Sequence, residues 1–176
     1  MNTNDASLIE TVSAELADWS REQKAVMEWQ PSRSLLASVR AYQSHSCKSG
    51  PVHAAARRIA VLRHRFWSIV SGADIPLNCS LGGGLLMPHP NGVVIHPDAT
   101  IGVNCLIFQQ VTIGAGGRRG LPRIGGHVDI GAGAKILGGV VVGDHARIGA
   151  NSVVIDDIPA GATAVGIPAR LVKLKS

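Results

Sequence analysis

The fold of this protein is decided by residues 124–154, which read IGGHVDIGAGAKILGGVVVGDHARIGANSVV. An aliphatic residue stands at every sixth position of this stretch, and a glycine follows most of them. An α-helix repeats every 3.6 residues and an exposed strand every two, so neither produces a period of six. The period indicates a solenoid of short strands in which every sixth side chain points into a narrow interior.

The same period extends toward the N-terminus and is interrupted once. Its aliphatic positions are Ile95, Ile101, Ile107, Ile113, Ile124, Ile130, Ile136, Val142, Ile148 and Val154. The step from Ile113 to Ile124 is eleven residues, so one repeat carries five extra residues. Since three hexapeptides make one triangular coil of about 18 residues, we expect segment 115–122 to leave the rod as a glycine-rich, basic loop. The loop is either a functional arm or a tolerated surface insertion.

Composition bounds the class of protein. The 176 residues suit one domain with a small appendage, and 45% hydrophobic against 16% charged residues argues against a disordered chain. No apolar run approaches the roughly 20 residues of a membrane span, and the N-terminus lacks the features of a signal peptide. Three cysteines give no disulfide framework, so we expect a cytoplasmic protein. The net charge of +5 permits an anionic partner, but no basic–aromatic pattern points to nucleic acid.

Glycine is concentrated beyond residue 72, whereas five of the six aromatic residues precede residue 74. We therefore expect an N-terminal helical region over residues 1–71, a β-helix over 72–166 and a C-terminal tail over 167–176. Pro31 and Pro51 each precede a segment of helical character, residues 32–46 and 52–70.

Two further features of the N-terminal region lead to expectations. Leu8, Val12, Leu16 and Trp19 share one helical face after the capping candidate Ser7, which predicts a first helix. Segment 52–70 carries four arginines beside large apolar residues, and it is either a face for a membrane surface or the solvated side of a packed helix. The arginines are Arg57, Arg58, Arg63 and Arg65.

Several motifs of the second half resemble one family. The matching stretches are ADIP (73–76), MPHPNGVVI (87–95), QVTIG (110–114), GAGAKILG (131–138) and VGIPAR (165–170). They resemble the hexapeptide-repeat acyltransferases, specifically the serine O-acetyltransferase family with its relatives from surface-polysaccharide gene clusters. The resemblance covers a little over half of the chain. It implies a left-handed parallel β-helix, acetyl-CoA as co-substrate and no metal.

The resemblance also assigns catalytic residues. The family's catalytic histidine matches His89, and its orienting aspartate matches Asp74, fifteen residues earlier. A neutral imidazole suits removal of a proton from an attacking hydroxyl, and a carboxylate on its other nitrogen fixes the tautomer. We expect Asn91, Arg118 and Arg119 to contact the acceptor.

In this family acetyl-CoA lies in a groove between neighbouring rods of a trimer. Small residues let the pantetheine arm approach the backbone, cationic side chains meet the phosphates, and backbone N–H groups after a strand stabilise the oxyanion. The corresponding candidates are Gly114, Ala115, Gly131, Ala132, Gly149, Ala150, Arg170 and Lys173. The glycine–alanine pairs also suit the geometry of the rod itself. Homotrimers, with hexamers as a further step, are therefore expected.

Departures from the family pattern bear on the acceptor. Pro88 stands where the serine-specific enzymes carry an aspartate, and Gly120-Leu121 stand where they carry an Arg-His pair. The helical region is short, and the tail lacks the terminal isoleucine that docks into cysteine synthase, so no such complex is expected. We therefore expect an O-acetyltransferase whose acceptor is a sugar of surface polysaccharide synthesis, working in the cytoplasm or at the inner face of the membrane. A serine O-acetyltransferase and a non-catalytic binding solenoid are the alternatives.

Overall fold

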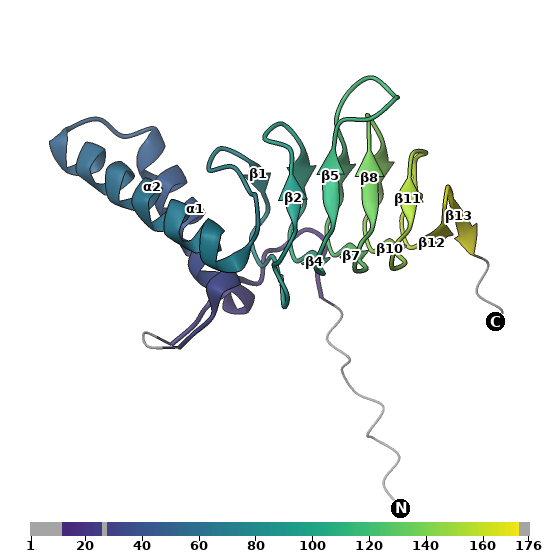
Figure 1. Ribbon diagram of the computed structural model, residues 1–176, viewed down its shortest axis with the longest axis horizontal. Helices are drawn as coiled ribbons and strands as arrows, with labels where there is room; N and C mark the ends of the chain where they lie inside the picture. The colour runs from purple at the N-terminus through teal and green to yellow at the C-terminus, as the bar shows by residue number, and fades with distance from the viewer. Residues whose placement is uncertain (1–11, 26–27, 173–176) are drawn as a thin grey trace, which may run out of the picture.

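A computed structural model describes residues 12–25 and 28–172, and it places two helices at one end of a rod of stacked coils (Figure 1). The helical elements are a 3₁₀ turn η1 (Trp19–Glu22), α1 (Pro31–Ser46) and α2 (Pro51–Ser71). The strands are β1 (Ser80–Leu81), β2 (Val94–Ile95), β3 (Thr100–Ile101), β4 (Leu106–Ile107), β5 (Thr112–Gly114), β6 (Arg123–Ile124), β7 (Asp129–Ile130), β8 (Lys135–Leu137), β9 (Val141–Val142), β10 (Arg147–Ile148), β11 (Val153–Val154), β12 (Thr163–Gly166) and β13 (Ala169–Val172).

The strands form three sheets, which are the three faces of the rod. The first sheet has the order β1-β3-β6-β9, the second β11-β8-β5-β2 and the third β13-β12-β10-β7-β4. All neighbours are parallel except β12 and β13, which pair antiparallel at the C-terminal end. The expected solenoid of mostly parallel sheets is confirmed, and β13 lies within the segment that we expected to be a tail.

Three edges separate the faces. Each is named for a feature beside it: His89, the inserted loop 115–122, or the N-terminal segment 12–18, which we call the strap. The His89 edge joins the third sheet to the second, the loop edge joins the second to the first, and the strap edge joins the first to the third. The predicted insertion is confirmed at the loop edge, because Thr100 pairs with Arg123, whereas Thr112 lies only 18 residues beyond its partner Val94.

The interior follows the six-residue period. All ten aliphatic positions of the series are buried, with exposed fractions of at most 4%. Small residues fill the positions four places later, including Ala99, Cys105, Ala134 and Ala146, each fully buried. The thin prism therefore needs no aromatic side chain, which accounts for the composition.

Helix α1 closes the N-terminal end of the rod. Leu35, Leu36 and Val39 are buried and join the core of the first coil. The first coil would otherwise leave unpaired carbonyls at the sheet edge, which is costly when buried. Gln43 Nε2 donates to Leu77 O and Cys79 O at 3.1 and 2.9 Å.

Helix α2 is outside α1, and it contacts the rod near its C-terminal end. His64 Nε2 of α2 donates to Ile75 O of the first coil at 2.8 Å. The helix ends at Ser71, and the residue that caps it, Gly72, has a φ of 65° in the left-handed region that glycine tolerates. Both of the helices that we predicted after Pro31 and Pro51 are confirmed.

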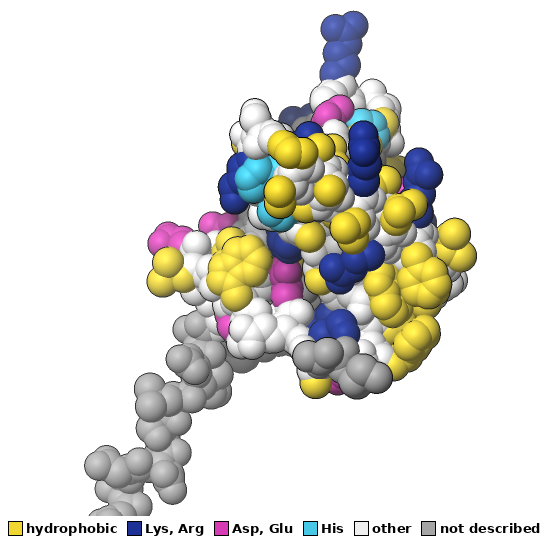
Figure 2. All heavy atoms as spheres, turned by 90° about the vertical axis from the view of Figure 1, so that its left-hand side faces the viewer, with side chains coloured by type: hydrophobic (Ala, Val, Ile, Leu, Met, Phe, Trp, Pro, Cys, Tyr) yellow, Lys and Arg dark blue, Asp and Glu magenta, His cyan; other side chains and the backbone are white. Residues whose placement is uncertain are grey.

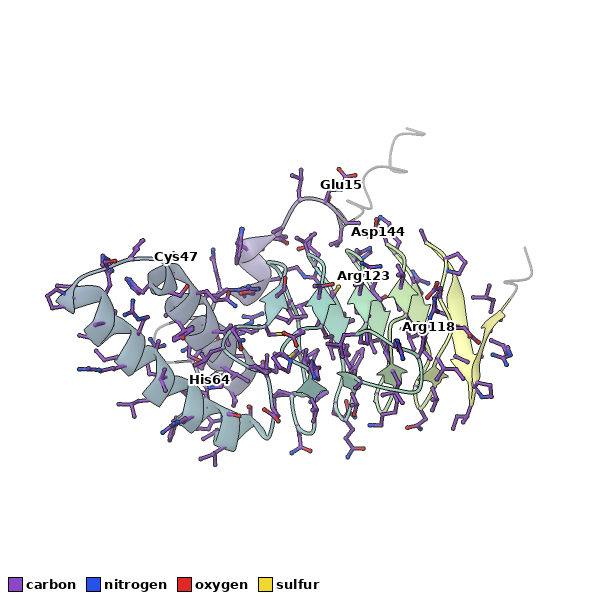
Figure 3. The ribbon with its side chains drawn as sticks, turned by 90° about the horizontal axis from the view of Figure 1, so that it is seen from above. Glu15, Cys47, His64, Arg118, Arg123 and Asp144 are labelled. Atoms are coloured by element: carbon purple, nitrogen blue, oxygen red, sulfur yellow. The ribbon has the colours of Figure 1, made fainter. Side chains whose placement is uncertain are left out.

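The expectation of a first helix through Val12, Leu16 and Trp19 is wrong for the described residues. Residues 12–18 are irregular and lie along the strap edge, and only the short turn η1 follows; Leu8 lies outside the described residues. Asn104 explains the difference, because its Nδ2 donates to Ser13 O and Leu16 O, both at 2.7 Å. These tertiary bonds satisfy the backbone groups that a helix would have paired internally. In Figure 3, Glu15 of this segment and Asp144 of the rod lie on the same side of the molecule.

Candidate functional site

The His89 edge carries most of the residues that the sequence singled out. Its corners stack through backbone hydrogen bonds from coil to coil. Gly92 N donates to Gly72 O at 2.7 Å, and Gln110 N donates to Asn91 O at 2.9 Å. The column continues from Gly133 N to Gln109 O at 2.9 Å and from Asn151 N to Ala132 O at 2.8 Å. One straight line along the rod therefore passes the His89 corner and then both glycine–alanine corners.

His89 lies in a corner that is longer than the others. Leu86 bridges to Leu106, 20 residues later, while the neighbouring coils repeat at 18, so two extra residues project here. Met87 and Val93 are buried on either side, with exposed fractions of 2% and 0%, and they anchor the corner at both ends. The ring itself is exposed, between two prolines that restrict the backbone. The extra length presents the imidazole beyond the surface of the rod.

Asp74 begins the second sheet one coil below Val94. Its N–H donates to Val93 O at 2.8 Å, and its carbonyl accepts from Ile95 N at 3.0 Å. Since the next residue, Ile75, is fully buried, the Asp74 side chain points outward, and it is exposed. Asp74 thus follows the His89 edge directly.

The two side chains are not bonded to each other in the isolated chain. Among residues 12–25 and 28–172, the histidine–carboxylate ion pair joins His96 to Asp98 instead, at 4.0 Å. Both Asp74 and His89 are therefore free to meet a further group at this edge. Lys135, which the sequence reasoning missed, lies on the outer face of the same sheet and donates to Gln110 O at 2.6 Å and Thr112 Oγ1 at 3.1 Å. The sequence does indicate this outward position, because Lys135 directly precedes Ile136, a core position of the six-residue series.

The small residues expected at acetyl-CoA occupy two different edges. Gly131, Ala132, Gly149 and Ala150 lie on the His89 edge, whereas Gly114 ends β5 and Ala115 follows it at the loop edge. A Cβ on Gly131 would lie 2.6 Å from Ala150 N, so the rod itself requires that glycine. A Cβ on Gly114 would meet nothing closer than His96 Cβ at 4.0 Å, so stacking does not explain this glycine.

The inserted loop folds back on its own rod. Arg118 Nη1, whose residue is labelled in Figure 3, forms an ion pair with Asp157 Oδ1 at 3.0 Å, and Asp157 also accepts from Val141 N at 2.9 Å. These contacts hold the pKa of Asp157 below its usual value, the backbone bond being the larger cause. Arg119 lines a hollow with Asp98 and Arg123.

The loop arginines and His89 are thus on different edges of one chain. The strand β5, three residues long, crosses the face between the two edges, a distance on the order of 10 Å. Arg170 lies in β13, at the C-terminal end of the third sheet and several coils from His89. Its Nη1 is 3.4 Å from Asp156 Oδ2. Lys173 lies outside the described residues.

The cysteines and the other histidines of the described residues lie away from the His89 edge or inside the core. Burial raises the pKa of the Cys79 and Cys105 thiols to about 11, so both stay protonated and fill space in the core. His127 and His145 lie on the strap edge with their Nδ1 atoms 2.8 Å apart; His127 is half-buried and His145 is exposed. Within the described part of the chain, no three His, Cys, Asp or Glu side chains are grouped as a metal site.

Comparison with known proteins identifies related chains. Residues 122–156 match the family described as bacterial transferase hexapeptide (six repeats). A serine acetyltransferase of Synechococcus elongatus is 42% identical over 107 residues, covering 59% of this chain and 44% of the relative. A serine acetyltransferase of Haemophilus influenzae is 32% identical over 172 residues, covering 96% and 64%.

Solved structures give the same result. A serine acetyltransferase in complex with CoA superposes with a TM-score of 0.68 at 34% identity, covering 82% of this chain and 58% of the other. Soybean serine acetyltransferase complexed with serine gives a TM-score of 0.64 at 36% identity, covering 81% and 56%. The chain spans less than two thirds of the length of each of these proteins.

Proposed function

Because the chain belongs to the serine O-acetyltransferase family of hexapeptide-repeat acyltransferases, we propose that it transfers an acetyl group from acetyl-CoA to a hydroxyl. One observation of the structure carries the proposal. A single edge of the rod holds an exposed histidine on a lengthened corner, an exposed aspartate beside it and a column of small residues beyond. The left-handed sense of the coils is part of this proposal, since it follows from the family.

The chemistry at this edge follows from the two side chains. The imidazole of His89 takes the proton from the hydroxyl while the hydroxyl oxygen bonds to the acetyl carbon. The carbon–sulfur bond then breaks, and the imidazolium returns its proton to the departing sulfur. The Asp74 carboxylate, which is not bonded to His89 in the free chain, would orient the ring and stabilise its charged form once the two side chains meet. The acetyl group passes directly, without a covalent enzyme intermediate.

The small residues of the His89 edge fit a thioester donor. Ala132 and Ala150 present only methyl groups on neighbouring coils, and Ala150 is exposed, so an extended chain can lie against the backbone. The rod explains why Gly131 is glycine, but it leaves Gly114 unexplained. Gly114 and the cationic loop lie on the loop edge, and from there they would contact the donor or the acceptor on the side opposite the His89 edge.

We propose that three copies associate, so that the loop of one copy approaches the His89 edge of the next. The separation of the two edges by a full sheet face supports this arrangement, because one rod cannot bring them together. Mixing inactive His89→Ala chains with inactive Arg119→Ala chains tests it, since mixed trimers would contain one site with both residues intact. Regained activity on mixing is expected; an absence of regain in verified mixed trimers would refute the shared site.

L-serine is the acceptor that we propose first. The relatives are named for it, and one solved relative holds serine. A sugar hydroxyl is the second candidate, because Pro88 and Leu121 cannot bind the ammonium and carboxylate groups of an amino acid as charged side chains would. The sugar acceptor, hexamers and a cytoplasmic location remain predictions.

Thiol release from acetyl-CoA tests the function. L-serine, L-homoserine, hexoses and nucleotide sugars would be compared as acceptors, with His89→Ala as the test variant and His145→Ala, on the strap edge, as its control. Loss of a catalytic base lowers kcat by about 10²–10⁴, while the control should keep its rate. Equal rates in wild type and His89→Ala would overturn the assignment, and release with a sugar but not with serine would decide for the second acceptor.

A further inference from the structure

Helix α2 presents an apolar face that nothing in the described chain covers. Only Ala60 and Ser71 of its residues are buried, because α1 packs against one side alone. The most exposed of its large apolar residues, with their exposed fractions, are Val52 (75%), Ile59 (58%), Leu62 (65%), Phe66 (55%) and Ile69 (83%). Their spacing of seven, three, four and three residues places them along one stripe. Within the described residues, neither α1 nor α2 has the length and hydropathy of a membrane-spanning helix.

The charge around this stripe has one sign. Residues 31–73 contain no aspartate or glutamate, and α2 alone carries four arginines. Arg57 donates to His45 O and Lys48 O at 3.0 and 2.9 Å, and so holds the end of α1. Arg58, Arg63 and Arg65 form no ion pair with any described residue and are exposed. Figure 2, which faces this end of the molecule, shows cationic side chains among the apolar ones.

An aromatic cluster lies beside the C-terminal half of the stripe. Trp29 is 70% exposed, and its ring centroid is 5.6 Å from that of Trp67. Phe66 packs edge-on against Trp67 at 5.1 Å. Tryptophan beside aliphatic and cationic residues is typical of helices that lie in the interface of a lipid bilayer.

We propose that the outer face of α2, together with Trp29, docks on a membrane surface of anionic phospholipids. Charge argues against a second copy of the same helix as the occupant. Arg58 and Arg65 flank the stripe seven residues apart, Arg63 flanks its other side, and a second α2 would bring the same three cations without one carboxylate. A negative lipid surface attracts all three. The proposal does not depend on the acetyl acceptor.

Co-sedimentation of the full-length chain with vesicles tests the proposal. Vesicles of phosphatidylcholine alone would be compared with vesicles containing phosphatidylglycerol, at low and high salt. We expect binding only to the anionic vesicles, a decrease in binding with salt, and a blue shift of tryptophan emission on binding. Removing one arginine should lower the affinity about fivefold, the effect of about 1 kcal/mol per cation at such a surface.

Matched variants separate docking from general charge and from folding. Arg58→Gln and Leu62→Ser alter the α2 face, while Arg147→Gln and Ile155→Ser alter exposed side chains of the rod. Only the first pair should weaken binding, and all four should keep the thermal stability and thiol release of wild type. Equal loss in both pairs, or no binding to anionic vesicles, would overturn the proposal. The proposal would also be overturned if wild type did not bind vesicles and the Leu62→Ser protein had a lower molar mass in solution than wild type. That result would assign the α2 face to a second copy of the chain.

Discussion

The side chain of Arg40 in α1 binds both η1 and the first coil of the rod. Its replacement therefore tests how α1 closes the N-terminal end of the rod. Its Nη2 lies 2.8 Å from Glu22 Oε1 of η1, and its Nη1 donates to Leu81 O at 2.7 Å. Nη2 also donates to Gly82 O at 2.6 Å. Glu22 Oε1 in turn accepts from Leu85 N at 3.1 Å. The exposed fractions of the Arg40 and Glu22 side chains are 20% and 9%, so the pair is largely shielded from water.

Arg40→Met keeps the alkyl stem and removes the charge. Breaking a buried ion pair costs about 3–5 kcal/mol, and the 20% exposure of Arg40 favours the lower end, since water can partly replace the guanidinium. We expect the free energy of unfolding to fall by about 3 kcal/mol. For a chain of this size that lowers Tm by about 6–12 °C.

Thermal and urea unfolding, followed by circular dichroism at one protein concentration, measure this loss. Arg147→Met is the control, because its side chain is 69% exposed and its Nε is 3.9 Å from Asp129, a pair worth less than about 1 kcal/mol. The double variant Arg40→Met with Glu22→Leu should recover part of the loss, since it leaves no unpaired carboxylate. A loss for Arg40→Met below about 1 kcal/mol, or equal to the control, would refute the reasoning.

Three further outcomes are expected. Gly102→Ala should lower the free energy of unfolding by several times more than Gly117→Ala, because its Cβ would run into the backbone of the next coil, whereas nothing lies within 4 Å at residue 117; equal Tm values would contradict this. In the native protein a thiol reagent at pH 8 should modify exposed Cys47 and spare Cys105, whose pKa is about 11, and rapid labelling of both would show that the core opens. Burial lowers the pKa of His127 below 6.5, so as the pH falls the unfolded chain takes up this proton before the folded chain does. The free energy of unfolding should therefore decrease as the pH falls from about 7 through 6.5 and below. If His127→Asn had the same pH profile as wild type, His127 would not be the cause.

The sequence by itself determined the rod. A period of six with small residues at a fixed offset is a local property of the chain, and each coil repeats the same contacts with its neighbour, so the period predicts the core position by position. The eleven-residue step placed the insertion, and proline placed the starts of α1 and α2. Residues His89 and Asp74 were found through the resemblance, and the fold then put them beside one edge.

Tertiary structure alone decided which segments close the N-terminal end of the rod and on which edge each candidate site residue lies. The segment before η1 has a helical pattern, yet Asn104, some 90 residues later, binds its carbonyls, and the segment is irregular instead of helical. The two extra residues of the His89 corner became visible only through strand register. The loop arginines proved to lie across a whole sheet face from His89, with Arg118 bound to Asp157. Such contacts join residues far apart in the chain, and neither propensity nor periodicity, which act locally, contains them.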